Sequence, residues 1–96
     1  MTLGPESRPI RSDRVLAQQV EGVAVLLSLD DGWYYQLNAV GSVIWDLCDG
    51  THAVAEIGQA VYAQFATSPE RAQADVAAFV ESLVADGLVV VADSPP

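Results

Sequence analysis

A hairpin that runs directly into a capped helix is the feature that most constrains how this chain folds. Branched apolar residues dominate Val23–Leu29, which predicts a strand, and Trp33–Leu37 predicts the returning strand. Asp30-Asp31-Gly32 lies between them and is typical of a hairpin turn, because glycine accepts a positive φ. Asn38 then predicts a helix N-cap, and Gly50 predicts the end of that helix. The segment therefore places a short aromatic strand immediately before a helix.

Periodic apolar residues predict further elements on either side of this segment. Val15–Val20 has strand character and makes the predicted sheet three-stranded and antiparallel. Val54–Phe65 predicts a second helix, and a third helix is predicted from the N-cap Ser68 to Asp86. Leu88–Val91 either adds a short terminal strand or packs on the core. The chain is thus predicted to be an α+β, winged helix-turn-helix-like domain, with a three-stranded antiparallel sheet followed by three helices.

Helical spacing also predicts which side chains face the core. In the first helix an apolar stripe recurs at i, i+3, i+4 and i+7, and Trp45 widens it; its members are Val40, Val43, Ile44 and Leu47. Ala53 stands where Ser or Thr would cap the second helix, so the start of that helix is predicted to be weak.

The ends of the chain differ in composition from the middle. Residues 1–13 are rich in proline and polar residues without a period, which predicts a flexible N-terminal arm. Residues 93–96 predict a disordered tail for the same reason. A chain of 96 residues has room for one domain, which we expect over residues 14–92.

The charge balance excludes one class of partner. The chain carries thirteen acidic residues against four arginines, for a formal net charge of −9. Nucleic acid is not an expected partner, because phosphate binding needs clustered Lys and Arg. A winged-helix regulator would need a basic third helix, and here Arg71 is outnumbered by acids. No apolar run reaches spanning length and there is a single cysteine, so we expect a cytoplasmic protein without membrane attachment.

The residues that carry chemistry are too few for a catalytic or metal site. Cys48 and His52 are four apart, but Gly50 lies between them and is predicted to end the helix, so we do not expect them to share a helix face. Together they would supply only two of the three or four ligands that zinc needs. Gly-rich phosphate-binding loops are absent from the sequence. We therefore expect no cofactor, no metal and no catalytic residue, and a binding module in place of an enzyme.

Three segments carry a resemblance to a known family: GWYYQLNAVGSVIWDLCDG, VAEIGQAVYAQF and DVAAFVESLVADGLV. Their shared features are an aromatic pair before Leu-Asn, a glycine three residues after that Asn, Ile-Trp in the first helix, and Gly-Leu after the third. The chain resembles the PqqD-like domains, also called RiPP precursor recognition elements, over about residues 14–91. The resemblance implies a non-catalytic adaptor that binds the leader segment of a ribosomally made precursor peptide. The leader is expected to add as a strand to the third strand, over a groove beside the third helix.

The resemblance also implies partners. A discrete protein of this size looks most like the leader-binding proteins of lasso-peptide clusters, whose partners are a cysteine-protease-like leader peptidase and an ATP-dependent cyclase. The alternative is a PqqD-type peptide chaperone in pyrroloquinoline quinone biosynthesis, where the partner would be a radical enzyme.

The expected peptide-binding residues come from two elements. A period of two puts Trp33, Tyr35 and Leu37 on the face that looks toward the core. Asp75 and Glu81 are candidates to pair with a basic leader residue, and Val76→Glu or Tyr35→Ala is predicted to abolish binding. The apolar stripe of the third helix equally fits plain core packing. The full expected set is Trp33, Tyr34, Tyr35, Gln36, Leu37, Ala72, Asp75, Val76, Phe79 and Val80.

Overall fold

The computed structural model describes residues 3–92 and confirms the α+β prediction. A three-stranded antiparallel sheet precedes three helices, and a small two-stranded sheet joins the two ends of the described chain. The elements are β1 (Arg8–Arg11), β2 (Val15–Val20), β3 (Val23–Ser28), β4 (Tyr34–Gln36), α1 (Ala39–Leu47), α2 (Val54–Gln64), α3 (Pro69–Ala85) and β5 (Val89–Ala92).

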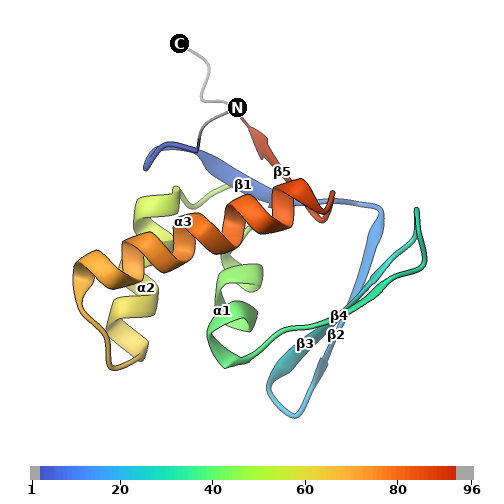
Figure 1. The fold of residues 1–96 in the computed structure, drawn as a ribbon, viewed down its shortest axis with the longest axis horizontal. Coiled ribbons are helices and arrows are strands. Elements are labelled where there is room, and N and C mark those ends of the chain that lie inside the picture. Colours follow the sequence, from blue (N-terminus) through green and yellow to red (C-terminus); the bar gives the residue numbers. More distant parts are fainter. Residues whose placement is uncertain (1–2, 93–96) are drawn as a thin grey trace.

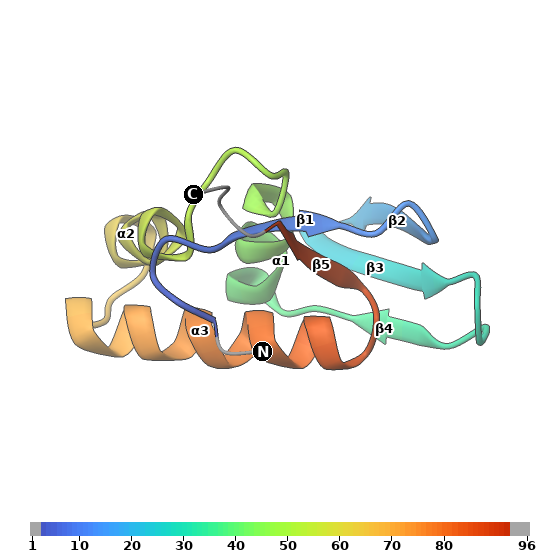
Figure 2. The same ribbon diagram turned by 90° about the horizontal axis from the view of Figure 1, so that it is seen from above.

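The helices form one body from which the sheet projects (Figure 1). The long helix α3 lies across α1 and α2, and the β2-β3-β4 sheet extends to one side of them as a wing. Seen from above, β4 lies on the α3 side of that sheet and β2 lies on the far side (Figure 2). No helix within residues 3–92 combines the length and the apolar character needed to cross a bilayer.

The core lies where the root of the wing meets the helices. Alternate residues of β3 point into it, whereas the residues between them are only half-buried on the outer face. Within α1 the buried face centres on Ile44 and Trp45, and Val40, Val43 and Leu47 are only partly buried, because the large indole turns that face inward. The buried apolar set includes Ala24, Leu26, Ile44, Trp45, Cys48, Val54, Ile57, Val61, Ala72, Val76, Val80, Leu83, Leu88 and Val89.

Side-chain caps begin two of the helices as predicted. Asn38 Oδ1 accepts a hydrogen bond from the Gly41 amide at 2.7 Å, and Ser68 Oγ accepts from the Arg71 amide at 3.1 Å. These caps satisfy amides that have no partner inside the helix. The boundaries of α1 and α3 therefore follow from local sequence signals.

The structure corrects one prediction about the N-terminal segment. Residues 8–11, predicted to lie in a flexible arm, form β1 and pair antiparallel with β5, while Pro9 is buried. Just before β1, the carbonyls of Pro5 and Ser7 accept hydrogen bonds from the first amides of α2 at 3.0 and 2.9 Å. They take the role that Ala53 cannot fill. Residues 1–2 and the predicted tail, 93–96, lie outside the described residues.

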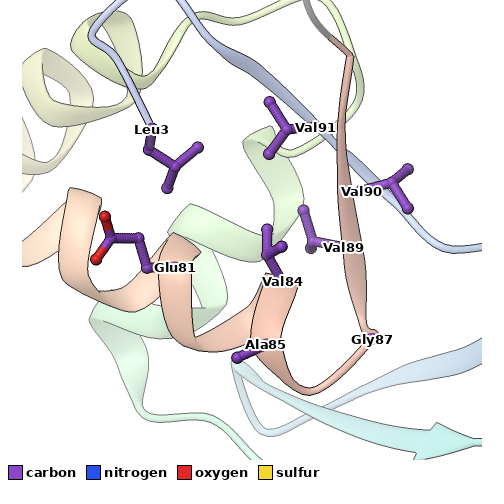
Figure 3. A pocket seen from close by; sticks show the side chains of 8 residues that line it. All are labelled: Leu3, Glu81, Val84, Ala85, Gly87, Val89, Val90 and Val91. Atoms are coloured by element: carbon purple, nitrogen blue, oxygen red, sulfur yellow. The ribbon is translucent and has the colours of Figure 1, made fainter. Parts of the chain in front are cut away.

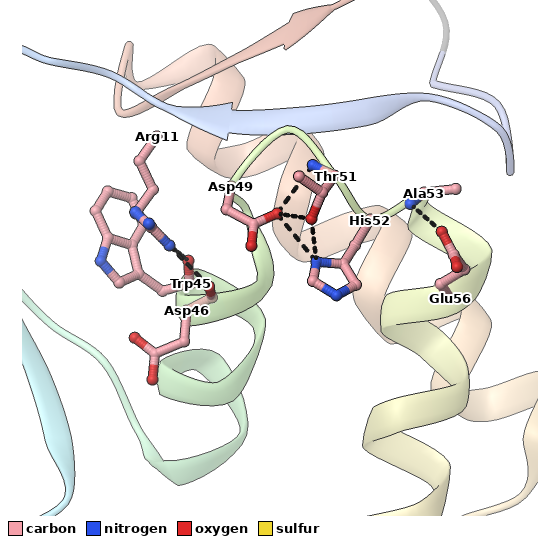
Figure 4. Close-up of polar contacts among 8 residues, drawn as sticks. All are labelled: Arg11, Trp45, Asp46, Asp49, Thr51, His52, Ala53 and Glu56. Carbon is pink, nitrogen blue, oxygen red and sulfur yellow. Dashed lines mark hydrogen bonds and ion pairs between the residues drawn. The ribbon is translucent and has the colours of Figure 1, made fainter.

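Arg11 ties β1 to the end of α1 (Figure 4). Its Nη1 donates to the carbonyls of Trp45 at 3.0 Å and Asp46 at 2.8 Å, which are among the last of the helix. The Trp45 carbonyl also accepts from the Cys48 amide at 3.1 Å, so the Asp46 carbonyl is the one that depends on Arg11. Because a cation at a helix C-terminus is favourable and satisfies such a carbonyl, Arg11→Ala is expected to lower the free energy of unfolding by about 1–2 kcal/mol. Arg8→Ala, an exposed change on the same strand, is the matched control in urea denaturation. Equal effects of the two changes would contradict this role.

Candidate peptide-binding groove

The outer edge of β4 is free of backbone partners within residues 3–92. The wing sheet has the order β2-β3-β4, so β4 is an edge strand. The last described strand, β5, pairs with β1 instead and leaves this edge uncovered. Unpaired strand edges accept additional strands, because their amides and carbonyls need hydrogen-bond partners.

The hydrogen bonds of β4 show which of its backbone groups are available. The Trp33 carbonyl accepts from β3 at 2.9 Å, and the Leu37 amide donates to β3 at 2.9 Å. Tyr35 lies between them opposite Leu26. Because bonding alternates along an antiparallel ladder, the amides and carbonyls of Tyr34 and Gln36 point away from β3. These two residues present the donors and acceptors that an added strand would use.

The side chains of β4 divide between two faces. Leu37 is buried and Tyr35 is half-buried on the side of the helices, whereas Tyr34 and Gln36 are exposed on the other side. Trp33 was predicted to share the inner face with Tyr35, but it is 65 % exposed. The reason is its place near the tip of the hairpin, which projects beyond the helices (Figure 1).

A groove of about 490 Å³ lies between the end of β4 and α3. Phe79 and Asp75, one turn apart on α3, form one wall. The opposite wall and the floor come from the end of β4 and the start of α1, through Gln36, Leu37, Asn38, Val40, Gly41 and Ile44.

Gly41 is what allows the two walls to approach. A Cβ on Gly41 would lie 3.0 Å from Phe79 Cζ and 3.2 Å from Asn38 Oδ1. Both distances are tighter than ordinary van der Waals contact, so a larger residue would displace the ring or the cap. The glycine therefore serves the packing of Phe79 at the groove.

The structure brings only part of the predicted site together. Gln36, Leu37, Asp75 and Phe79 line the groove, and Trp33, Tyr34 and Tyr35 continue along the strand that leads to it. Three residues predicted as groove wall instead lie in the core at 1 % exposure or less: Ala72, Val76 and Val80. The lining residues from α1, such as Val40, were not predicted as site residues. Their one sequence signal was Gly41, an unfavourable residue inside a helix.

Charge at the groove is negative and exposed. Asp75 is 61 % exposed and lies 3.8 Å from Arg71, a long and solvated ion pair that contributes little to stability. Partial burial raises the pKa of the Tyr35 phenol, and Asp31 and Asp86 raise it further. Tyr35 is therefore neutral at pH 7, and the groove favours basic over acidic ligands.

A larger hollow of about 690 Å³ lies elsewhere, between β5, the C-terminal half of α3 and the N-terminal segment (Figure 3). Leu3, Val84 and Val89 give it an apolar lining. Glu81, a predicted partner for a basic leader residue, lines this hollow and not the groove beside β4.

Hydrogen bonds among Asp49, Thr51 and His52 hold the loop between α1 and α2 (Figure 4). Asp49 Oδ1 accepts from the amide and the hydroxyl of Thr51 at 2.9 and 2.6 Å, and His52 Nδ1 lies 3.0 Å away. Hydrogen bonds from Thr51 and then from His52 lower the pKa of Asp49. Within residues 3–92 no group of three His, Cys, Asp or Glu residues is arranged to hold a metal ion.

Cys48 lies beside this loop but is fully buried. Burial raises the pKa of its thiol to about 12, with Arg11 opposing the shift. Because the thiolate is the reactive form, folded protein at pH 8 is expected to react with Ellman's reagent at least about 100-fold more slowly than urea-unfolded protein. Equal rates in the two states would contradict the burial of this thiol.

Comparison with known proteins assigns the chain to a family. The family model described as coenzyme PQQ synthesis protein D (PqqD) matches residues 24–89. The chain belongs to the PqqD family. That match runs from β3 to the start of β5 and so includes β4, the groove and α3. No curated protein sequence matches the chain.

Two solved structures have a similar fold. One is described as TbiB1 in complex with the TbiA(beta) leader peptide; it is 31 % identical, has a TM-score of 0.77, and the match covers 83 % of this chain and 93 % of that one. The other is described as lasso peptide synthetase B1 complexed with the leader peptide; it is 25 % identical, has a TM-score of 0.78, and the match covers 86 % of this chain and 98 % of that one.

Proposed function

We propose that this PqqD-family chain is a non-catalytic recognition protein that binds the leader segment of a ribosomally synthesised precursor peptide. The leader adds as a strand to β4 and lays side chains into the groove beside α3. The observation that carries the proposal is the free edge of β4, where the backbones of Tyr34 and Gln36 face outward next to an open groove. The two similar structures, both described as leader-peptide complexes, support it.

Magnitudes decide which contacts matter. Each backbone hydrogen bond contributes about 0.5–1.5 kcal/mol net, whereas ordering a flexible peptide costs about 2–5 kcal/mol. The free energy gained from backbone hydrogen bonds along β4 is therefore nearly cancelled by the cost of ordering the peptide. Each large apolar side chain that the protein buries adds about 1.5–3 kcal/mol. Two such anchors therefore contribute about 3–6 kcal/mol, and the upper end of that range corresponds to a dissociation constant of tens of micromolar.

The proposed site assigns different roles to the predicted residues. Tyr34 and Gln36 supply the backbone groups that face outward from the edge of β4. Leu37 lines the groove, and Trp33 and Tyr35 lie along the strand that leads to it. Asp75 and Phe79 supply the helix side. The buried residues Ala72, Val76 and Val80 set the position of α3 from behind and do not touch the peptide.

The descriptions of the matching structure and of the matching family suggest two different biosynthetic pathways. We propose that the chain acts in lasso-peptide biosynthesis and presents the precursor to a cysteine-protease-like leader peptidase and an ATP-dependent cyclase. The structure described as a lasso peptide synthetase B1 favours this pathway. The second candidate is a PqqD-type chaperone in pyrroloquinoline quinone biosynthesis, which the description of the matching family favours.

Fluorescence polarisation with the labelled leader of a candidate precursor peptide tests the function. We expect a dissociation constant in the micromolar range or below, and no binding of a scrambled leader. Binding weaker than millimolar would contradict leader recognition. Faster cleavage of that precursor by a cysteine-protease-like leader peptidase when this protein is added would distinguish the lasso pathway from the quinone pathway.

A further inference from the structure

The groove beside β4 does not end at the start of α1. A second hollow of about 470 Å³ lies beneath the link between α2 and α3. It shares two lining residues, Val40 and Asp75, with the groove. Since the same two side chains border both spaces, the groove and this hollow are neighbouring compartments of one trough that runs along α3.

The second compartment has an apolar floor and a polar rim. Val61 is buried and Phe65 is half-buried, and both lie at the end of α2. The Phe65 amide still donates to the Val61 carbonyl at 2.9 Å, but the backbone of Phe65 is already extended. The chain therefore leaves the helix here and opens space beside the ring. Thr67, Ser68 and Arg71 form the rim.

We propose that a peptide bound along β4 continues past the strand and places a second apolar side chain in this compartment, against Phe65 and Val61. The inference rests on the proposed function and extends it: the ligand is an extended peptide with two separated apolar anchors. Asp75 lies at the junction of the two compartments, so a basic residue is favoured between the anchors. The second anchor raises affinity by about 10–100-fold.

Selection from a display library of random 14-residue peptides on the immobilised protein tests the inference without a known ligand. Wild-type protein is expected to enrich peptides with two separated apolar positions. Phe65→Ala protein is expected to enrich peptides with a single apolar position. Ala66→Arg introduces bulk at an exposed lining position without removing core contacts, and we expect the same loss. Tyr62→Ala, an exposed aromatic on the same helix outside the trough, is the matched control and keeps both positions.

The outcomes separate the two proposals. A two-anchor peptide should lose at least about tenfold in affinity for Phe65→Ala and for Ala66→Arg, and keep its affinity for Tyr62→Ala. Enrichment of single-anchor peptides by wild-type protein, or unchanged selection by Ala66→Arg, would overturn the second anchor while leaving leader binding intact. Absence of any enrichment would overturn both. Ala66→Arg decides the result if Phe65→Ala does not fold.

Discussion

Replacing Gln36 by proline is expected to abolish leader binding while the domain stays folded. The Gln36 amide faces away from β3, so its loss breaks no hydrogen bond within the sheet, and proline is tolerated on strand edges. An incoming strand, however, loses that donor and meets the pyrrolidine ring in its place. We expect affinity for the leader, measured by fluorescence polarisation, to fall at least about 30-fold, or about 2 kcal/mol.

Gln36→Ala is the matched control for this change. It removes the side chain but keeps the outward amide, so affinity is expected to stay within about threefold of wild type. Circular dichroism spectra and melting temperatures should agree among the three proteins. Equal affinities for the proline and alanine variants would show that the edge of β4 takes no part in binding.

Val76→Glu is expected to unfold the domain. Val76 has no exposed surface and packs in the middle of α3 against the core. A buried, unpaired carboxylate costs several kcal/mol, and a domain of this size is stable by about 5–15 kcal/mol. We expect a loss of more than about 4 kcal/mol in urea denaturation. The sequence alone predicts that this change abolishes leader binding at the site; the structure assigns the loss to folding.

Val84→Glu provides the comparison on the same helix. Val84 is 38 % exposed and lines the hollow beside β5, so its carboxylate reaches water. Its effect on the free energy of unfolding is expected to stay below about 1 kcal/mol. A folded Val76→Glu protein with near wild-type stability would contradict the placement of this face of α3 in the core.

Local signals explain which parts of the fold were predictable. Three features can each be predicted from a few neighbouring residues, and each is present in the structure: the hairpin turn before Trp33, the Asn38 cap and the start of α3 at Ser68-Pro69. The pairing of β1 with β5 was not predictable in this way. Its two strands lie at opposite ends of the chain, and the prolines and arginines around β1 carry no strand period.

The candidate site was predictable on its strand side only. An aromatic edge strand before a capped helix can be read from alternation and turn chemistry. On α3, however, the core stripe through Val76 lies directly beside the stripe through Asp75 and Phe79 that lines the groove. Helical spacing identifies an apolar face but not the boundary between its covered and open parts. Only the packing of α1 against α3, with the end of β4 across the groove from α3, sets that boundary.

Amide hydrogen exchange by NMR, with and without bound leader, is the most direct test of strand addition to β4. The amides of Tyr34 and Gln36 face solvent in the free protein and should become protected by at least about tenfold on binding, because a new strand accepts their hydrogen bonds. The amides of β2, the other edge of the wing sheet, should keep their rates. Protection at β2 or β5 with unchanged exchange at Tyr34 and Gln36 would contradict the account.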